Sequence, residues 1–234
     1  MTYVFAGDSW ALKGFTEQNH NQGNSSPQPG DVRLADHWPW QYQLALAPGQ
    51  GNMAVLGKIQ ALHCADSVPV IWVWTEPGRD YGYCYPNNDA HDWIRSENIF
   101  ELRKELEYAT LTTIRKSIPN PIGLIGGLSD VDPDLAQQLG FSVLEPSWQK
   151  WIANTLKSQW FRHGWGASDI GWRTHHNSVT PSRAATFAWD EQIKEWCWWE
   201  ENGYFCHEHP TPRANQEFAE YLKPTVERWF NEQR

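Results

Sequence analysis

The first stretch of the chain constrains the fold most, because it predicts a short buried strand that stops abruptly. Residues 3–6 are all apolar and can fill one such strand. The polar turn Gly7-Asp8-Ser9 then follows. The carboxyl end of a first strand is where open α/β sheets keep their ligand sites. The pattern therefore places Ser9 on the rim of such a sheet, with its hydroxyl exposed.

Further segments alternate between strand-like and helix-like patterns along the chain. An almost continuous apolar run over residues 68–75 is typical of a central parallel strand, and residues 121–126 and 141–144 predict two more strands. Helices are expected over residues 31–47, 53–62, 97–117, 134–139, 147–157 and 181–201. This alternation predicts one α/β domain with helices on both faces of a parallel sheet. We expect the strand near residues 2–6 to be central, between those near 68–75 and 121–126, in flavodoxin-like order.

Charge and apolar patterning exclude two classes of partner. The net charge is −9 and there is no long basic run, so nucleic acid is a poor partner, since phosphate binding needs clustered Lys and Arg. No apolar run is long enough to span a membrane, and the first residues lack the features of a Sec-type signal. We therefore expect a cytoplasmic protein, or one released without such a signal.

The four cysteines are widely spaced and form no CxxC pair. Without an export signal they are expected to be reduced thiols, with a disulfide as the alternative. Cys206, His207 and His209 can also be read as metal ligands, but structural zinc needs four ligands and no CxxC pair supplies the others. Cys64 with His63 would contribute only if the fold brings them near. We therefore expect no metal and no cofactor.

Tryptophan is unusually abundant and is concentrated in the C-terminal third. The chain has 16 Trp, of which ten lie from Trp148 onward. Residues 158–182 carry no clear period and include Trp160, Trp165 and Trp172, so we expect an insertion or lid there. Aromatic side chains bury large areas in cores and lids, and they also line grooves that bind sugars or rings.

A second polar motif lies near the C-terminal end, at His209-Pro210-Thr211-Pro212. Thr211 is a good N-cap and Pro212 a good first helical residue. Apolar residues then recur at helical spacing over residues 214–229. His209 is therefore expected in the loop just ahead of a C-terminal helix.

The Gly-Asp-Ser turn and the His-Pro pair ahead of a C-terminal helix together resemble the SGNH, or GDSL, hydrolase family. The resemblance implies a flavodoxin-like three-layer sandwich with a central parallel sheet of about five strands. It also implies that Ser9 is the nucleophile and that His209 is the general base that takes its proton. The family's second block is a glycine whose backbone N–H, with that of the nucleophile, holds the oxyanion.

Two glycines, Gly49 and Gly51, could fill that second block. In the family, the helix after this glycine buries two apolar residues, about seven and ten positions after the glycine. Counting from Gly49, those positions fall on Leu56 and Ile59, whereas the count from Gly51 gives a lysine and an alanine. The resemblance therefore assigns the oxyanion hole to the backbone of Ser9 and Gly49.

Two polar positions of the family pattern are missing from this chain. No Asn follows the strand over residues 68–75, where the family has a further oxyanion donor. Cys206 stands where the family's Asp-x-x-His-Pro block has the acid that orients the histidine, and a neutral thiol cannot supply that charge. Three alternatives stay open. Another acid takes the role, with Glu208, Glu76 and Asp80 as candidates; or a Ser–His dyad operates; or the protein is inactive.

The leading hypothesis is a serine hydrolase, an esterase or deacylase, that acts on a small acyl ester. A carbohydrate ester is the substrate that a Trp-rich rim would favour. The alternative is a binding protein that keeps the fold, has lost catalysis and uses the Trp-rich rim for its ligand. A third reading is a structural or assembly protein whose Trp-rich surface is an interface. The sequence does not distinguish between oligomeric states.

Overall fold

The computed structural model describes the central sheet and most of the helices around it. The described residues are 2–14, 31–75, 77, 80, 99–127, 130–148, 151, 185–190, 195–200, 205–206 and 209–233. The Trp-rich insertion expected over residues 158–182 lies outside them, so a single domain with that insertion stays a prediction. No helix in the described part is long and apolar enough to cross a membrane.

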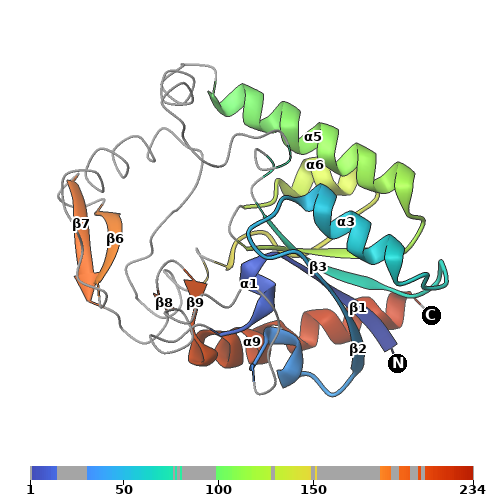
Figure 1. Ribbon diagram of the computed structural model, residues 1–234, viewed down its shortest axis with the longest axis horizontal. Helices are drawn as coiled ribbons and strands as arrows, with labels where there is room; N and C mark the ends of the chain where they lie inside the picture. The colour runs from blue at the N-terminus through green and yellow to red at the C-terminus, as the bar shows by residue number, and fades with distance from the viewer. Residues whose placement is uncertain are drawn as a thin grey trace.

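Within the described residues, five parallel strands form the central sheet (Figure 1). They are β1 (Thr2–Gly7), β2 (Gln41–Leu46), β3 (Val70–Trp74), β4 (Ile122–Gly126) and β5 (Ser142–Glu145). Their spatial order is β2-β1-β3-β4-β5, and each neighbouring pair is parallel. This is the flavodoxin-like order, and it confirms the expected three-layer sandwich around a five-stranded parallel sheet.

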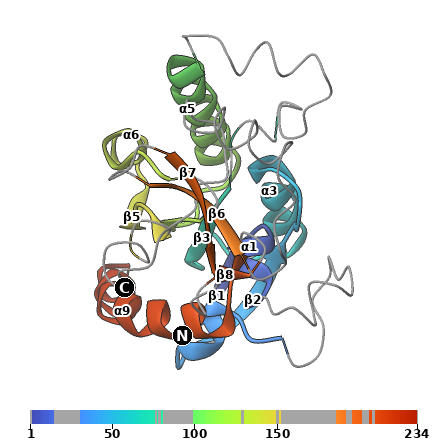
Figure 2. The same ribbon diagram turned by 90° about the vertical axis from the view of Figure 1, so that its left-hand side faces the viewer.

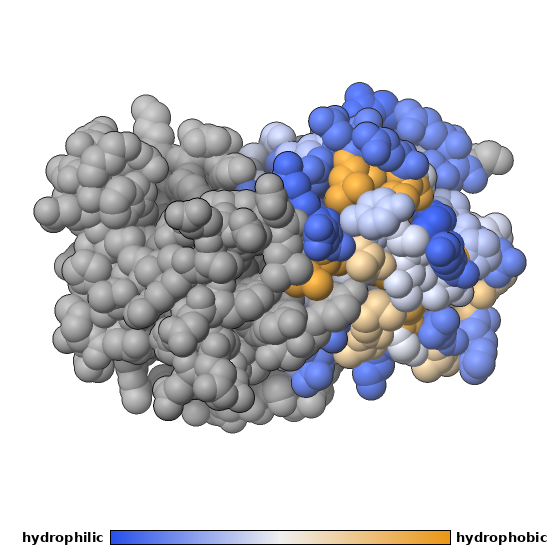
Figure 3. All heavy atoms as spheres, turned by 90° about the horizontal axis from the view of Figure 1, so that it is seen from above, coloured by the Kyte–Doolittle hydropathy of each residue, from blue (hydrophilic) through white to orange (hydrophobic). Residues whose placement is uncertain are grey.

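Helices cover both faces of this sheet (Figures 1 and 2). They include α3 (Asn52–Ala61), α5 (Ile99–Ser117), α6 (Pro133–Gln138) and α9 (Pro212–Glu232), close to the ranges that periodicity predicted. The helices α3, α5 and α6 lie on one face and α9 lies on the other. The outer surface over α5 is mainly hydrophilic in its described part, around a smaller hydrophobic area (Figure 3). Of the helix expected over 147–157, only residues 147, 148 and 151 are described.

Alternation along the strands divides the core into two buried clusters. Tyr3 and Phe5 of β1 pack on one face with apolar residues of α9 such as Phe218. Val4 and Ala6 pack on the other face with apolar residues of α3, α5 and α6. Because both faces are buried, the inner strands read as nearly continuous apolar runs, and this is why they could be predicted.

The helix predicted over residues 31–47 is wrong. This segment is a short 3₁₀ helix, η1 (Leu34–His37), followed by strand β2 at the edge of the sheet. Apolar residues four apart share one face of a helix, but they also share one face of a strand. The side chains of residues 42, 44 and 46 all pack against the cluster under α9, as a strand requires. Pro39, between the two elements, has no N–H with which to continue a helix.

The missed strand also corrects the expected neighbours of β1. The pairing with β3 is confirmed, with Val4 opposite Val70. On its other side β1 pairs with β2, with Val4 opposite Gln43. The strand near residues 121–126 is β4, which pairs with β3 and not with β1. The middle strand of the five is therefore β3.

The helix predicted over residues 181–201 is also wrong, because the segment contains two antiparallel strands. These are β6 (Ala185–Asp190) and β7 (Glu195–Glu200), and their register sets Trp189 opposite Trp196. Aromatic residues favour strands through opposed pairs of this kind. Their density in this segment leaves no helical period that would have distinguished the two structures.

Glu145, at the end of edge strand β5, joins the sheet to α9. One of its carboxylate oxygens accepts a hydrogen bond from the Tyr221 hydroxyl of α9 at 2.9 Å, and the other accepts one from the Ser147 backbone N–H at 3.2 Å. Burial raises the pKa of Glu145, the negative charge of Asp130 adds to this, and the two hydrogen bonds act in the opposite direction. The folded protein therefore keeps a proton on Glu145 at pH values where the unfolded chain has lost it.

This raised pKa predicts a specific pH dependence of stability. A glutamate in the unfolded chain loses its proton near about pH 4.3. As the pH rises from there through the raised pKa of Glu145, its ionisation favours the unfolded state, so the free energy of unfolding falls. Glu145→Gln cannot ionise, so the variant should gain stability relative to the wild type as the pH rises from about 4.3 through the raised pKa of Glu145. Urea unfolding at several pH values checks this, and a difference that does not change with pH would contradict it.

Candidate functional site

The carboxyl ends of β1 and β3 mark the place where this strand order puts a ligand site. In flavodoxin-like sheets the chain reverses its direction of winding between these two strands, and ligands bind in the crevice outside their carboxyl ends. Asp8 follows β1 directly and Thr75 follows β3 directly, and both are buried. Ser9 therefore lies at the carboxyl ends of the strands, where the sequence placed it.

A series of buried hydrogen bonds links the carboxyl ends of these strands to one another and to α3. The Thr75 hydroxyl donates to a carboxylate oxygen of Asp8 at 2.6 Å. The side-chain Nδ2 of Asn52 donates to the Thr75 carbonyl at 3.0 Å, and the Thr75 backbone N–H donates to Asn52 Oδ1 at 3.3 Å. The ends of β1 and β3 and the start of α3 are therefore held by one another.

Sequence reasoning did not identify Asn52 as a member of this site, and it placed Thr75 at the end of the strand without giving it a role. It looked for an Asn directly after β3 and found none. The structure brings an asparagine amide to that place from the first residue of α3 instead, and the amide is bonded to the backbone of Thr75. The only available signal was an Asn directly after Gly51, at the start of a predicted helix.

The first turn of α3 is capped by a side chain from the loop after β3. Gly51 is the N-cap residue and has no side chain to accept from the free N–H groups. The Asp80 carboxylate accepts from the N–H of Met53 at 2.7 Å and from that of Asn52 at 3.1 Å. A Cβ on Gly51 would collide with this carboxylate, so glycine is required there. Asp80, one of the candidate orienting acids, is thus already bonded to α3.

Gly49, the predicted oxyanion donor, lies in the turn between β2 and α3. It is exposed, has a φ of +70°, and nothing lies within 4 Å of the position a Cβ would take. A left-handed φ favours glycine at this position. The buried glycine of this segment is Gly51, whereas Gly49 faces open space, and its role in an oxyanion hole stays a prediction.

Ser9 is the first residue of the short helix α1 (Ser9–Leu12), two residues after the end of β1. The turn is tight because the Ala11 N–H donates to the Asp8 carbonyl at 3.1 Å. Gly7 makes room for it, since a Cβ there would lie 2.7 Å from Ala11 Cβ and 2.9 Å from the Val73 carbonyl oxygen. The strand, turn and position of Ser9 are as the sequence predicted.

His209 lies in a two-residue strand and not in the loop that the sequence predicted. This strand, β9 (His209–Pro210), pairs with β8 (Phe205–Cys206), so that Cys206 is opposite His209. Thr211 then caps α9, accepting from the Ala214 N–H at 3.2 Å, and Pro212 begins the helix as expected. Strand β9 contacts both α1 and α9, so the segment that carries His209 lies beside the segment that begins with Ser9 (Figure 1).

Several residues of the predicted site lie outside the described part of the chain. These are Glu76, His207 and Glu208. In the described part, no group of three or more His, Cys, Asp or Glu residues is arranged to hold a metal ion. Cys64 is a free thiol, and its sulfur donates to the side-chain oxygen of Gln43 at 3.1 Å.

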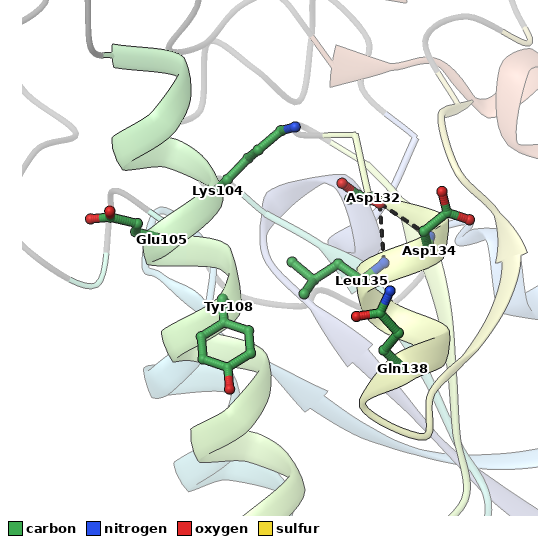
Figure 4. A pocket seen from close by; sticks show the side chains of 7 residues that line it. All are labelled: Lys104, Glu105, Tyr108, Asp132, Asp134, Leu135 and Gln138. Carbon is green, nitrogen blue, oxygen red and sulfur yellow. Dashed lines mark hydrogen bonds between the residues drawn. The ribbon is translucent and has the colours of Figure 1, made fainter.

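A separate groove of about 430 Å³ lies between α5 and α6 (Figure 4). The residues that line it are Lys104, Glu105, Tyr108, Asp132, Asp134, Leu135 and Gln138. Asp132 caps α6 from this groove by accepting from the N–H groups of Asp134 and Leu135, each at 3.1 Å. None of the residues predicted to be catalytic lines this groove.

Comparisons with known proteins add little to this geometry. No protein family matches the sequence, and no curated protein matches it. A solved structure, the crystal structure of TesA, aligns with 98% of this chain and 99% of its own, with a TM-score of 0.43 and 12% sequence identity. At this identity and TM-score the similarity is distant.

The cap that Asp80 supplies to α3 can be tested by its effect on stability. Asp80→Ala removes the acceptor for two backbone N–H groups, and we expect the free energy of unfolding to fall by about 1–2 kcal/mol. Asp132→Ala is the matched control, since Asp132 caps α6 through the same two kinds of bond. Chemical denaturation of both variants measures the effect. A loss for Asp132→Ala alone would show that Asp80 does not stabilise α3.

Proposed function

We propose that this protein is a serine hydrolase, an esterase or deacylase, that acts on a small acyl ester. Ser9 is the nucleophile and His209 is the general base. The observation that carries the proposal is the contact between α1 and β9, at the edge of the sheet where α/β proteins bind ligands. Two chain segments that are far apart in sequence, each with one of the groups that acyl transfer needs, lie side by side there.

The chemistry follows from these two groups and the backbone around them. A serine hydroxyl is a weak nucleophile until a base takes its proton, and an imidazole does this near neutral pH. Ser9 Oγ then attacks the ester carbonyl while His209 holds the proton, and the alcohol leaves with that proton. Water repeats the same steps on the acyl-enzyme. Backbone N–H groups of Ser9, at the start of a helix, and of Gly49 stabilise the oxyanion in each step.

A third group is needed to orient the imidazole of His209. Cys206 is opposite His209 in the β8–β9 pair, and its thiol is a weak acceptor. Asp80 is a poor candidate because its carboxylate is bonded to two N–H groups of α3. Glu208 and Glu76 therefore remain as candidate acids, and a Ser–His dyad with a backbone carbonyl as acceptor is the other alternative.

A second candidate function is a binding protein that has the fold without the catalysis. Two observations favour it. The Asn52 amide is bonded to the Thr75 backbone at the place where the family's oxyanion donor would stand. The residue opposite His209 is Cys206 in place of a carboxylate. A carbohydrate or other ring ligand on the Trp-rich segment would be its partner.

Replacing the nucleophile distinguishes these two functions. The wild type should hydrolyse short p-nitrophenyl esters, and Ser9→Ala should lower kcat by at least about 10³-fold, because the covalent step is lost. A serine-directed phosphonate should label Ser9 and no other residue. Turnover that survives Ser9→Ala would assign the chemistry to another residue. A wild type that is inactive on a broad panel of esters would favour the binding protein.

Introducing a carboxylate at Cys206 tests the missing acid. In serine proteases, loss of the charge on the triad carboxylate lowers kcat by roughly 10⁴-fold. If no acid reaches His209, Cys206→Asp should raise kcat at pH values where the imidazole is neutral. If Glu208 or Glu76 already orients His209, Cys206→Asp should gain nothing, and removal of that glutamate should lower kcat. Steady-state kinetics of the three variants distinguishes these alternatives. If none of the three substitutions changes kcat, the Ser–His dyad is the remaining mechanism.

A further inference from the structure

Three separate segments of the chain meet at one carbonyl oxygen, that of Val32. The backbone N–H of Gly14 donates to it at 2.7 Å, and the side-chain Nδ2 of Asn215 donates to it at 3.2 Å. Gly14 follows α1, Val32 precedes η1, and Asn215 lies in the first turn of α9. We call this contact of Gly14, Val32 and Asn215 the Val32 joint.

Two further contacts make the joint rigid. A Cβ on Gly14 would lie 2.4 Å from the backbone nitrogen of Pro212, so the chain approaches α9 closely only because this residue is glycine. Beside the joint, Lys13 Nζ lies 3.7 Å from a carboxylate oxygen of Asp31, with side-chain exposures of 0% and 8%. A buried ion pair resists separation, since parting it leaves a charge buried without compensation.

Asn215 is present at this joint for its hydrogen bond and not for filling space. It is fully buried, yet its Oδ1 has no hydrogen-bond partner among the described residues. A buried amide costs free energy wherever it is not bonded, and an apolar side chain would carry no such cost. Its neighbours on the inner face of α9, such as Phe218 and Leu222, are apolar. The bond to Val32 is what an apolar residue could not supply.

The joint connects the two segments that carry the proposed catalytic residues. The helix α1 begins at Ser9, and the chain reaches Gly14 two residues after that helix ends. The strand β9 carries His209 and leads through the Thr211 cap directly into the first turn of α9. The joint therefore ties the exit of one segment to the exit of the other.

We propose that Asn215 is a positioning residue that sets the distance between Ser9 and His209. This inference rests on the proposed hydrolase function. Proton transfer needs the two groups within hydrogen-bond reach, and a displacement of about 1 Å can lower the rate about 10²-fold. Asn215 touches neither the substrate nor the reacting atoms. It acts through the backbone of Val32 and Gly14.

Asn215→Ala tests this role, with Asn120→Ala as the matched control. Asn120 is also a buried asparagine, and its Nδ2 donates to the backbone carbonyls of Ala65 and Val68, each at 2.9 Å. It precedes β4 and so lies at the amino ends of the strands, whereas the candidate site lies at their carboxyl ends. With p-nitrophenyl acetate we expect kcat of Asn215→Ala to fall about 10- to 100-fold with KM within about threefold. Asn120→Ala should stay within about twofold of the wild type in both constants.

Amide hydrogen exchange measures the joint without any turnover. The Gly14 N–H should exchange at least about tenfold faster in Asn215→Ala than in the wild type, and at the wild-type rate in Asn120→Ala. Gly14→Ala is a second variant, which opens the joint from the other side by collision with Pro212. It should reproduce the loss of kcat, so that the test holds if Asn215→Ala fails to fold.

The outcomes separate this inference from the function on which it rests. An equal loss of kcat in Asn215→Ala and Asn120→Ala, or exchange at Gly14 that Asn215→Ala leaves unchanged, would overturn the positioning role. A wild type that hydrolyses no ester would overturn the hydrolase function and the positioning role with it. Faster exchange at Gly14 in that case would still show that the joint itself exists.

Discussion

The hydrogen bond from Thr75 Oγ1 to the Asp8 carboxylate, buried and 2.6 Å long, holds together the two strand ends between which the candidate site lies. Hydrogen bonds inside a protein polarise one another, so connected bonds of this kind strengthen each other. The Asn52 amide extends this group to the start of α3. The proposed nucleophile follows Asp8 directly, so its backbone position is determined by β1, β3 and α3 together.

The sheet also explains which parts of the fold could be read from the sequence. Both faces of β1, β3 and β4 are buried, and such strands give short, nearly continuous apolar runs bounded by turn residues. The edge strand β2 exposes Gln41 and Gln43, and its mixed pattern satisfies helical and strand spacing equally. The prediction for the Trp-rich strands β6 and β7 failed for a related reason, because apolar residues that occur too densely show no period.

In the candidate site, some residues were predicted from local sequence signals and others were not. The segments of Ser9 and His209 were placed by local signals, namely a turn after a strand and a cap with proline before a helix. The bonds of Asn52, Thr75 and Asp80 were not predicted, because they join residues 23 to 67 positions apart, and no spacing rule relates such residues. The bond between Val32 and Asn215 spans 183 positions and could be found only in the folded chain.

The position of α9 has a consequence for how the protein forms during synthesis. The five strands and the helices α3, α5 and α6 all leave the ribosome before residues 212–232, and they can bury one face of the sheet by themselves. The other face, with Tyr3, Phe5 and Ile71, lacks most of its cover until α9 arrives, since before then only short segments such as η1 pack on it. A nascent chain at that stage presents an aromatic surface to chaperones and to other chains. His209 is made only just before α9, so the proposed catalytic pair is completed at the same late stage as this cover.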